Sequence, residues 1–369
     1  MRIGIIATPL DQQYAGVHYY TKHLIESLLS IDDRNEYFVF REKVDQNSLQ
    51  GAHQVKIPAI PWLIGYKSLE LFYHIPKRAR RLDLDVMIEP AHFGPFNLPP
   101  RIKRVTVIHD LTPLLFKEWH TFNGWYLQKR FLPGIVNRAD LIITNSEYTK
   151  QDIITHLGKD SEQIVAALLG ISPLFRPVDS PHLLWKYGIH RPYILYQGTI
   201  EPRKNLIRLI EAYNRYRDAV HENPRQLVLS GKQGWKYEEI VEVKNRSPYA
   251  EDILSIGYVT REDMPAIYSG CDLFIYPSLY EGFGLPIIEA LACGAKVITS
   301  TSSSLPEVGG DMASYFDPHD TEELAALILT ELKIPSTEID KSQRVQHARE
   351  FTWNHTAETV LTALESQFA

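Results

Sequence analysis

The amino-acid sequence predicts an α/β protein made of two doubly wound domains, each a parallel sheet covered by helices, that face each other across a cleft. Short, wholly apolar runs typical of buried parallel strands alternate with longer segments of helical periodicity. A proline-rich stretch, ISPLFRPVDSP at residues 171–181, interrupts this alternation, and the pattern then begins again. A chain of 369 residues is long enough for two hydrophobic cores.

The first half opens with a buried strand at residues 2–7, followed by a loop containing Gly16 and a helix at residues 18–30. Strand, glycine turn and helix begin a nucleotide-binding fold. The GxGxxG fingerprint is missing, which weighs against a dinucleotide such as NAD or FAD. Gly16 is either a plain helix-entry glycine or a point where the backbone approaches a ligand closely.

One of the further strands expected in the first half is followed directly by a pair of polar residues. We expect these strands at residues 37–40, 55–57, 86–88, 105–108 and 141–144. The strand at 105–108 ends in His109-Asp110, where an open α/β sheet keeps its ligands. Asp83-Leu84-Asp85 matches the DxD pattern of metal-dependent sugar transferases, but it opens a strand instead of closing one. We therefore predict no metal site there.

Two segments of the first half combine large apolar residues with charge or aromatic character. Residues 67–82 carry Lys77, Arg78, Arg80 and Arg81 among aliphatic and aromatic side chains. Such a basic segment either ends a solvated helix or rests on an anionic membrane surface. Residues 119–131 are aromatic-rich and form either a helix or a binding loop.

The second half begins after a boundary that we place between residues 175 and 176. A strand at 193–197 leads through Gly198 to Arg203 and Lys204, at the start of a helix. Two cations at the end of a strand attract an anionic ligand, although they also fit a solvated helix start. Further strands are expected at 227–230, 254–256 and 296–299.

The most informative stretch is YPSLYEGFGLPIIEALACG, residues 276–294. It reads as the end of a strand, a flexible glycine loop, and a helix that begins near Pro286 and stops at Gly294. Glu281 in the loop and Glu289 in the first turn of the helix bracket the free N–H groups of the helix start, a ready anion site. Carboxylates on both sides suit the hydroxyls of a ligand with a phosphate in its middle.

Composition excludes several other classes. The net charge of −6 argues against a nucleic-acid partner, which would require a basic footprint. Cys271 and Cys293 form no metal-type pair and no disulfide framework, which fits a reducing cytoplasm. No stretch reaches the roughly 18 apolar residues of a membrane span. We expect a cytoplasmic protein, at most peripheral at the inner membrane face.

Together these residues resemble the retaining glycosyltransferases of the GT-B fold, which has two Rossmann-like domains, and specifically glycosyltransferase family 4. The most specific mark is EGFGLPIIEA, with Glu281 and Glu289 separated by seven residues. Residues 198–205, 231–234, 257–259 and 304–310 are secondary marks. The segment HDLTPL, residues 109–114, resembles the subset that contains mannosyltransferases of polysaccharide assembly.

The resemblance implies a catalytic set. Arg203 and Lys204 would neutralise the departing diphosphate, Glu281 would hold hydroxyls of the donor sugar, and His109 would lie near that sugar, with Asp110 as a further candidate beside it. The implied donor-binding residues are Gly16, Gly198, Tyr258, Val259, Phe283, Gly284, Leu285 and Glu289. Among them, Glu289 would accept hydrogen bonds from ribose hydroxyls, and the turn at 257–259 would lie against the base.

The implied activity is retaining, metal-independent transfer of a hexosyl unit, favouring mannose from GDP-mannose, to a glycan or lipid-linked saccharide acceptor. No cofactor is implied beyond this nucleotide-sugar co-substrate. A UDP- or dTDP-sugar donor is the alternative within the class, and a non-catalytic nucleotide-sugar-binding subunit is the alternative outside it. Residues 1–175 would form the acceptor-side domain, with a helix at about 353–369 crossing back to it, and residues 176–352 would form the donor domain.

Overall fold

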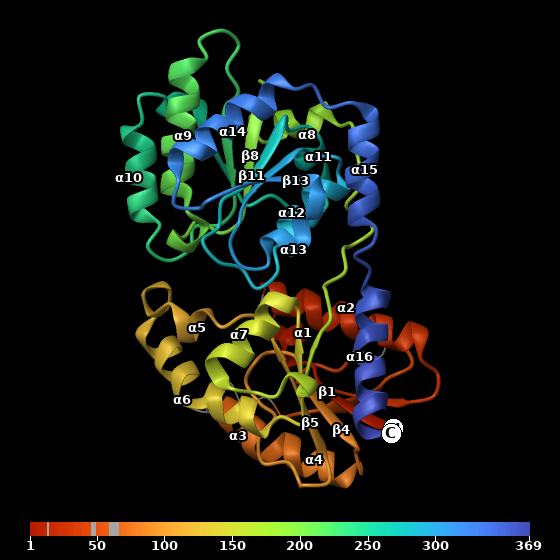
Figure 1. Ribbon diagram of the computed structural model, residues 1–369. Coiled ribbons are helices and arrows are strands. Elements are labelled where there is room, and N and C mark those ends of the chain that lie inside the picture. The colour runs from red at the N-terminus through yellow and green to blue at the C-terminus, as the bar shows by residue number, and fades with distance from the viewer. Residues whose placement is uncertain (13–14, 46–48, 59–65) are drawn as a thin grey trace. The chain divides into compact units, whose positions relative to one another are not determined.

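The structure is a computed structural model that describes residues 1–12, 15–45, 49–58 and 66–369. The chain divides into two compact α/β units (Figure 1). The first unit comprises Met1–Gly170 together with Trp353–Ala369, and the second comprises Ile171–Thr352. The division after residue 170 lies slightly before the boundary expected between 175 and 176, because Ile171 already donates its N–H to Phe351 O at 2.9 Å.

Among the described residues, the sheet of the first unit has seven parallel strands in the order β3-β2-β1-β4-β5-β6-β7. The strands are β1 (Arg2–Ile6), β2 (Glu36–Arg41), β3 (His53–Lys56), β4 (Val86–Glu89), β5 (Lys103–Ile108), β6 (Leu141–Thr144) and β7 (Ile164–Ala166). The interior strands β4 and β6 are buried throughout, as the apolar runs with which they begin, residues 86–88 and 141–143, predict. The strand order reverses between β1 and β4, so this sheet has its topological switch point there.

Helices cover the sheet of the first unit. They are α1 (Thr8–Gln12), α2 (Ala15–Ile31), α3 (Tyr66–Leu69), the π-helix η1 (Glu70–His74), α4 (Ile75–Arg81), α5 (Thr112–Leu115), η2 (Lys117–Trp119), α6 (Phe122–Arg138), α7 (Glu147–Leu157) and η3 (Ser161–Gln163). The prediction of a loop up to residue 17 was wrong. Helix α2 starts at Ala15, so Gly16 lies in its first turn.

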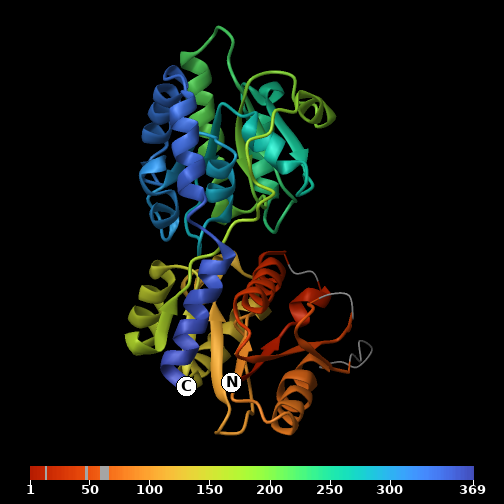
Figure 2. The same cartoon turned by 90° about the vertical axis from the view of Figure 1, so that its right-hand side faces the viewer.

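The C-terminal helix α16 (Trp353–Phe368) belongs to the first unit, where it packs against α2 (Figures 1 and 2). Its buried face carries Ala357, Val360 and Leu364. Thr356 Oγ1 donates a hydrogen bond of 2.5 Å to Leu168 O. The last helix of the chain therefore completes the core of the unit that contains the first strand.

The sheet of the second unit has six parallel strands among the described residues, in the order β10-β9-β8-β11-β12-β13. The strands are β8 (Tyr193–Gln197), β9 (Gln226–Ser230), β10 (Ile253–Gly257), β11 (Leu273–Tyr276), β12 (Val297–Ser300) and β13 (Ala313–Phe316). β8 pairs directly with β11 although the two are far apart in sequence. The switch point of this sheet therefore lies between β8 and β11.

The helices of the second unit flank this sheet on both faces (Figure 1). They are α8 (Pro181–Lys186), η4 (Pro202–Lys204), α9 (Leu206–Ala219), α10 (Glu238–Arg246), η5 (Ala250–Asp252), α11 (Met264–Ser269), α12 (Leu285–Ala292), α13 (Leu305–Gly309), η6 (Gly310–Met312), α14 (Thr321–Lys333) and α15 (Glu338–Ala348). Two parallel-sheet α/β units confirm the predicted fold class.

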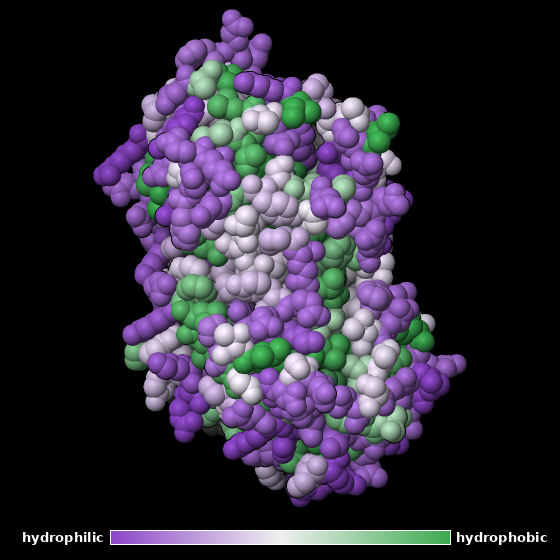
Figure 3. All heavy atoms as spheres, in the orientation of Figure 1, coloured by the Kyte–Doolittle hydropathy of each residue, from purple (hydrophilic) through white to green (hydrophobic). Residues whose placement is uncertain are grey.

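The surface is mixed. On the face shown in Figure 3, hydrophobic residues stand in small groups among hydrophilic ones. Within the described ranges, no helix is long and apolar enough to cross a membrane.

Candidate active site

The switch point of the second sheet brings together the most specific segments of the sequence. β8 leads into η4, which carries Arg203 and Lys204, and β11 leads into the loop with Glu281. Because β8 and β11 are neighbouring parallel strands, both segments emerge at the same edge of the sheet. Open α/β sheets bind ligands outside the carboxyl ends of the strands at such a point.

Arg203, Lys204 and Glu281 form one ion-paired cluster there. Glu281 Oε2 accepts a hydrogen bond from Arg203 Nη1 at 2.6 Å, and Glu281 Oε1 accepts one from Lys204 Nζ at 2.5 Å. Lys204 and Glu281 are both buried. Charge-assisted hydrogen bonds of this length hold all three side chains in defined positions. The structure thus joins residues that are predicted site members from separate parts of the sequence.

Two residues that the sequence did not single out complete this cluster. Tyr276 Oη accepts a hydrogen bond from Lys204 Nζ at 2.8 Å and donates one to Glu281 Oε1 at 3.0 Å. Glu201 Oε1 accepts from Arg203 Nε at 3.2 Å and from Nη2 at 3.0 Å. Arg203 is therefore held between two carboxylates. The only available signals were the position of Tyr276 at a strand end and of Glu201 two residues before the arginine.

The neighbouring charges in the cluster determine the protonation state of Glu281. Burial acts against the ionised form of Glu281, but the adjacent Arg203 and Lys204 more than offset this and lower its pKa to about 2. Burial lowers the pKa of Lys204, whereas the charge of Glu281 acts to raise it. Glu281 is consequently ionised at neutral pH. Together with Glu201, the cluster carries two cations and two carboxylates.

The loop between β11 and α12 is held firmly, contrary to the flexibility that its glycines led us to predict. Glu281 N donates to Ser303 Oγ at 2.8 Å, and Ser304 Oγ donates to Phe283 O at 2.7 Å. Gly284 has a φ of +115°, and a Cβ there would lie 2.9 Å from Leu305 Cδ2. Only glycine fits this position without strain. Helix α12 begins directly after it, at Leu285.

Glu289 lies in a different environment from Glu281. The prediction that it occupies the first turn was wrong, because α12 starts at Leu285 and places Glu289 in the second turn. Its Oε2 accepts a hydrogen bond of 3.3 Å from Tyr268 Oη. Burial raises the pKa of Glu289 to about 7, against the opposing charge of Arg261. One glutamate of the pair is therefore firmly ionised and the other titrates near neutral pH.

Three glycine turns lie side by side at the same edge of the sheet. Gly198 follows β8 with a φ of +153°, and Gly231 follows β9 with a φ of +144°. A Cβ on Gly231 would lie 1.8 Å from Gly198 O. Gly231 N also donates to Gly257 O at 2.8 Å, which ties the turn after β9 to the end of β10. The absence of side chains is what lets these turns cross so closely.

The turn after β10 presents an aromatic ring to solvent. Tyr258 is 59 % exposed, and Lys232 Nζ lies 4.6 Å from the centroid of its ring. The neighbouring Val259 is buried. An exposed ring of this kind offers a stacking surface for a planar ligand group.

His109 follows β5 in the first unit and lies partly buried beside a second histidine. His109 N donates to His92 Nε2 at 2.6 Å, and His109 Nε2 lies 2.9 Å from Pro90 O. Burial lowers the pKa of His109 to about 3, and the neighbouring His92 acts in the same direction. His109 is therefore uncharged at neutral pH, and the contact with a carbonyl oxygen places its proton on Nε2. His92 was not anticipated from the sequence.

Asp110 lines a cavity of about 510 Å³ in the first unit. Its Oδ1 accepts hydrogen bonds from Thr112 N at 2.9 Å and Thr112 Oγ1 at 2.6 Å. Much of the remaining lining is apolar, including Phe93 and Leu127. Gln128 also lines the cavity, and its Oε1 is buried with no hydrogen-bond partner among the described residues.

Gly16 shows no packing reason for being glycine. A Cβ at this position would meet no other atom within 4 Å. The structure therefore leaves the ligand-approach interpretation of Gly16 as a prediction.

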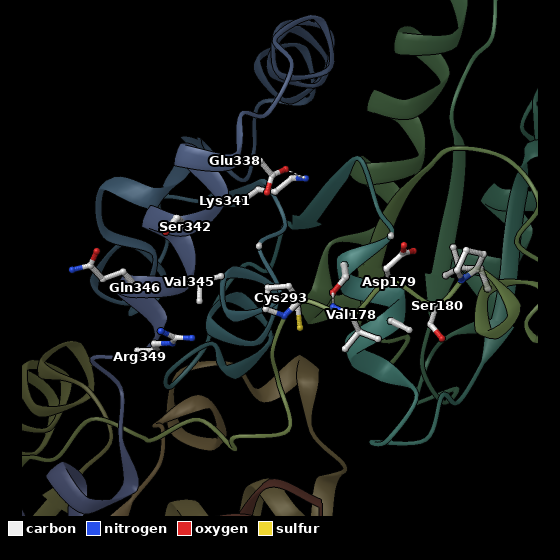
Figure 4. A pocket seen from close by; sticks show the side chains of 17 residues that line it. Val178, Asp179, Ser180, Cys293, Glu338, Lys341, Ser342, Val345, Gln346 and Arg349 are labelled. Carbon is white, nitrogen blue, oxygen red and sulfur yellow. Dashed lines mark hydrogen bonds and ion pairs between the residues drawn. The ribbon is translucent and has the colours of Figure 1, made fainter.

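Another cavity, of about 1030 Å³, lies wholly in the second unit. Figure 4 shows Val178, Asp179 and Ser180 on one side of it and Val345 and Arg349 of α15 on the other. None of the predicted site residues lines this cavity, so its size alone does not make it the active site.

The DxD segment lies at the amino end of β4, away from the carboxyl edge of its sheet. Asp83 pairs with Arg101, and Asp85 Oδ2 accepts from Arg2 N at 2.7 Å. Over residues 1–12, 15–45, 49–58 and 66–369, no three His, Cys, Asp or Glu side chains are grouped to hold a metal ion.

Comparison with known proteins gives matches over most of the chain. Residues 14–173 match the family model "Glycosyltransferase Family 4", and residues 183–350 match "Glycosyl transferases group 1". The O-antigen chain mannosyltransferase B of Escherichia coli is 36% identical over 278 residues, which cover 73% of this chain and 72% of that protein. The serotype-specific mannosyltransferase WbdA of Escherichia coli is 30% identical over 266 residues, 69% of this chain and 32% of that longer protein. Among solved structures, sucrose-phosphate synthase from Thermosynechococcus elongatus matches with a TM-score of 0.74 and 18% identity, covering 100% of this chain and 99% of that one.

Proposed function

The chain belongs to glycosyltransferase family 4 and has the GT-B fold, and on that premise we propose that it transfers mannose from GDP-mannose to a glycan or lipid-linked saccharide. We further propose that transfer retains the anomeric configuration and needs no metal ion. The observation that carries the proposal is the ion-paired cluster of Arg203, Lys204 and Glu281 at the switch point of the second sheet. The choice of mannose follows two relatives whose names are those of mannosyltransferases.

In this proposal the nucleotide-sugar donor lies along the carboxyl edge of the second sheet, and each of its parts meets one of the predicted donor-binding segments. The diphosphate would lie at the start of α12, where the N–H groups of Phe283, Gly284 and Leu285 end the loop. The base would stack near the exposed Tyr258, beside the buried Val259. Gly198, which has no side chain, would let the backbone of the turn after β8 approach the ligand closely. Glu289 would accept hydrogen bonds from the ribose hydroxyls once ionised.

Two cations next to one another account for the proposed independence from metal. Lys204 has three N–H donors, of which the contacts with Glu281 and Tyr276 account for two. If Glu281 turns toward hydroxyls of the donor sugar, Arg203 and Lys204 become available to the diphosphate. Their positive charge then replaces the charge that a divalent ion would supply to the leaving group.

The proposed reaction needs no protein nucleophile. The acceptor hydroxyl oxygen forms a bond with the anomeric carbon on the face from which the phosphate departs, while the bond between that carbon and the phosphate oxygen breaks. The departing phosphate oxygen takes the proton of the acceptor hydroxyl. The protein contributes by positioning and by stabilising the diphosphate charge. The role of His109 near the donor sugar stays a prediction; its ring is uncharged, and its Nε2 lies 2.9 Å from Pro90 O.

The saccharide acceptor would bind to the first unit. The cavity lined by Asp110 and Gln128 has the character of a saccharide site, because apolar walls surround a few polar groups that can bind hydroxyls. The unpartnered Gln128 Oε1 is a hydrogen-bond acceptor in that wall.

A donor panel tests the proposal. The protein is incubated with GDP-mannose, UDP-glucose, UDP-N-acetylglucosamine or dTDP-rhamnose, each with a bacterial glycan extract and a chelator, and the released nucleotide is quantified. We expect release of GDP from GDP-mannose in the presence of chelator. Release of UDP or dTDP alone would reject mannose as the donor sugar, and activity that needs added metal would reject metal independence.

A non-catalytic nucleotide-sugar-binding subunit remains the alternative from another class. It predicts that the protein binds GDP-mannose without turnover. Slow release of GDP that is abolished in Lys204→Ala would favour the enzyme, because a pure binding protein has no turnover to lose.

A further inference from the structure

The first unit contains another cavity, of about 500 Å³, which we call the arginine cavity. It lies between the loop after β4, strand β5, helix α6 and the π-helix η1. Its lining residues are Phe72, Gly94, Pro95, Phe96, Asn97, Arg104, Thr106, Arg130, Phe131, Gly134, Ile135, Arg138 and Ala139. Three of them are arginines and none is acidic.

Among the residues that the structure describes, the three arginines of the cavity have no carboxylate partner. Arg104 Nη2 donates to Leu98 O at 2.8 Å, and Arg130 lies 5.7 Å from the ring centroid of Phe131. In the described part of the chain, no side-chain ion pair involves Arg104, Arg130 or Arg138. The neighbouring carboxylate of Asp140 instead accepts the backbone N–H of Arg104 and pairs with Lys103.

Three like charges around one cavity repel each other, and an anion between them removes that repulsion. Guanidinium groups present paired N–H donors that match phosphate oxygens, and phosphate is therefore the anion that suits this lining best. Asn97 adds an amide group to the lining, and within the described ranges only one of its two N–H donors is accounted for, by Phe72 O at 3.2 Å. The electrostatics of the cavity thus indicate a phosphate ligand.

The surroundings of the cavity are apolar and exposed. Phe72 and Phe96 stack at its wall with ring centroids 4.4 Å apart. Among the described residues, six of the twelve exposed large hydrophobic side chains lie in residues 69–73 and 122–127. Those six are Leu69, Phe72, Tyr73, Phe122, Tyr126 and Leu127. A small soluble phosphate would leave these side chains in water.

Helix α6 carries both exposed aromatic side chains and two of the arginines that line the cavity. Phe122, Tyr126 and Arg130 are spaced four residues apart in α6, so each is a neighbour of the next on the helix surface. Phe122 is 66 % exposed and Tyr126 is 54 % exposed. The exposed aromatic rings therefore lead along the helix to Arg130, whose guanidinium group lines the cavity.

We propose that the arginine cavity binds the phosphate group of a lipid, with the lipid chain against the exposed side chains of residues 69–73 and 122–127. The phosphate would contact Arg104, Arg130 and Arg138. This binding does not depend on the transfer reaction. The extension that the bound lipid carries the saccharide acceptor rests on the proposed function.

Vesicle flotation tests the proposal. The full-length protein is mixed with phosphatidylcholine vesicles that contain phosphatidic acid, or with vesicles that contain oleate at matched surface charge. We expect about tenfold preference for the phosphate-bearing vesicles, in line with one or two charge-assisted hydrogen bonds. In the double variant Arg130→Gln/Arg138→Gln the preference should fall to about one.

The matched control is Arg80→Gln/Arg81→Gln, which removes two exposed charges from the neighbouring helix α4. It can weaken binding to both kinds of vesicle, because any surface charge attracts an anionic membrane, but it should leave the preference for phosphate unchanged. Equal binding of the wild type to both vesicles, or a preference that survives in the cavity variant, would overturn the proposal.

Two further measurements distinguish a lipid from a soluble phosphate ligand, and a failure of the lipid proposal from a failure of the proposed transferase activity. Stabilisation by inorganic pyrophosphate that is present in the wild type and lost in Arg130→Gln/Arg138→Gln, without any vesicle preference, would mean a soluble phosphate ligand in this cavity and would reject the lipid. The thermal unfolding midpoint of Arg130→Gln/Arg138→Gln without vesicles should stay close to that of the wild type, which shows that the variant is folded. Failure of the wild type to release GDP from GDP-mannose rejects the proposed transferase but leaves the vesicle result standing.

Discussion

At the scale of single residues, Glu281 is both a predicted sugar ligand and the partner of the two cations. Its carboxylate contacts Arg203 and Lys204, and in the proposed donor complex it would compete with the diphosphate for both cations. We expect Glu281→Gln to lower kcat by about 10²–10³-fold, as loss of one charged contact typically does. GDP binding should stay equal or become tighter, because both cations are released. Steady-state kinetics and calorimetric titration with GDP measure the two effects.

Glu201→Gln is the matched control. Glu201 accepts hydrogen bonds from Arg203, whereas the carboxylate that Lys204 contacts is that of Glu281. It should change kcat much less than Glu281→Gln. GDP binding that weakens strongly in Glu281→Gln would contradict the competition between the carboxylate and the diphosphate.

Glu89, at the end of β4, makes stability depend on pH. Burial raises the pKa of Glu89 to about 8, and the nearby Glu70 acts in the same direction. The unfolded chain loses this proton near pH 4.3. Between about pH 4.3 and pH 8 the folded state binds one proton more, so stability should fall with rising pH by roughly 1.4 kcal/mol per unit.

Glu89→Gln keeps the shape of the protonated carboxyl and does not titrate. Urea unfolding from pH 5 to pH 8 should therefore show a smaller fall in stability for this variant than for the wild type. The exposed Glu222→Gln serves as the control and should follow the wild type. Parallel curves for Glu89→Gln and wild type would show that Glu89 is ionised in the folded protein.

At the scale of elements, the turns after β8 and β9 can cross only without side chains. In Gly231→Ala the new Cβ would meet Gly198 O at 1.8 Å, so one turn must move. We expect a clear loss of stability and a raised KM for the donor, because both turns border the proposed donor site. Thermal unfolding and donor kinetics measure this.

Gly257→Ala is the comparison for that variant. Gly257 has a φ of +69°, but a Cβ there would meet nothing within 4 Å. Its cost should be limited to about 1–2 kcal/mol of backbone strain. If the two alanine variants behave alike, the crossing of the turns is not what requires Gly231.

The elements that the sequence predicted well are those with strong local signals. β8, β11 and α12 follow apolar runs and helix boundary residues, and Gly294 has the left-handed conformation expected after a helix. The short strands β7 and β13 were missed, because three or four residues with partial burial carry little periodicity. Helix α1 was missed for the same reason.

The composition of the candidate site could be predicted, but its internal contacts could not. Glu281 and Lys204 stand in recognisable segments, yet their pairing depends on β8 lying beside β11, which is a property of the sheet order. The hydroxyl of Tyr276 between them depends on that register too. The pKa of Glu289 depends on burial that spacing alone does not reveal.

At the scale of the whole molecule, the last helix of the chain stabilises the first unit. Deletion of residues 353–369 removes a buried face that includes Trp353, Val360 and Leu364 and packs against α2. We expect faster hydrogen exchange in α2 and unchanged protection of β8 and β11 in the second unit. Deletion of residues 366–369 alone, a largely exposed end, is the control. Unchanged exchange in α2 of the longer deletion would contradict this role of α16.

The central claim is that this family 4 glycosyltransferase transfers mannose from GDP-mannose with retention. Time-resolved proton NMR of the reaction with GDP-mannose and a mannose-terminated oligosaccharide, in the presence of a chelator, tests it most directly. The account predicts that the first new anomeric signal is that of an α-mannoside, the configuration of the donor, and that it rises together with free GDP. A β-mannoside as the first product would contradict the account.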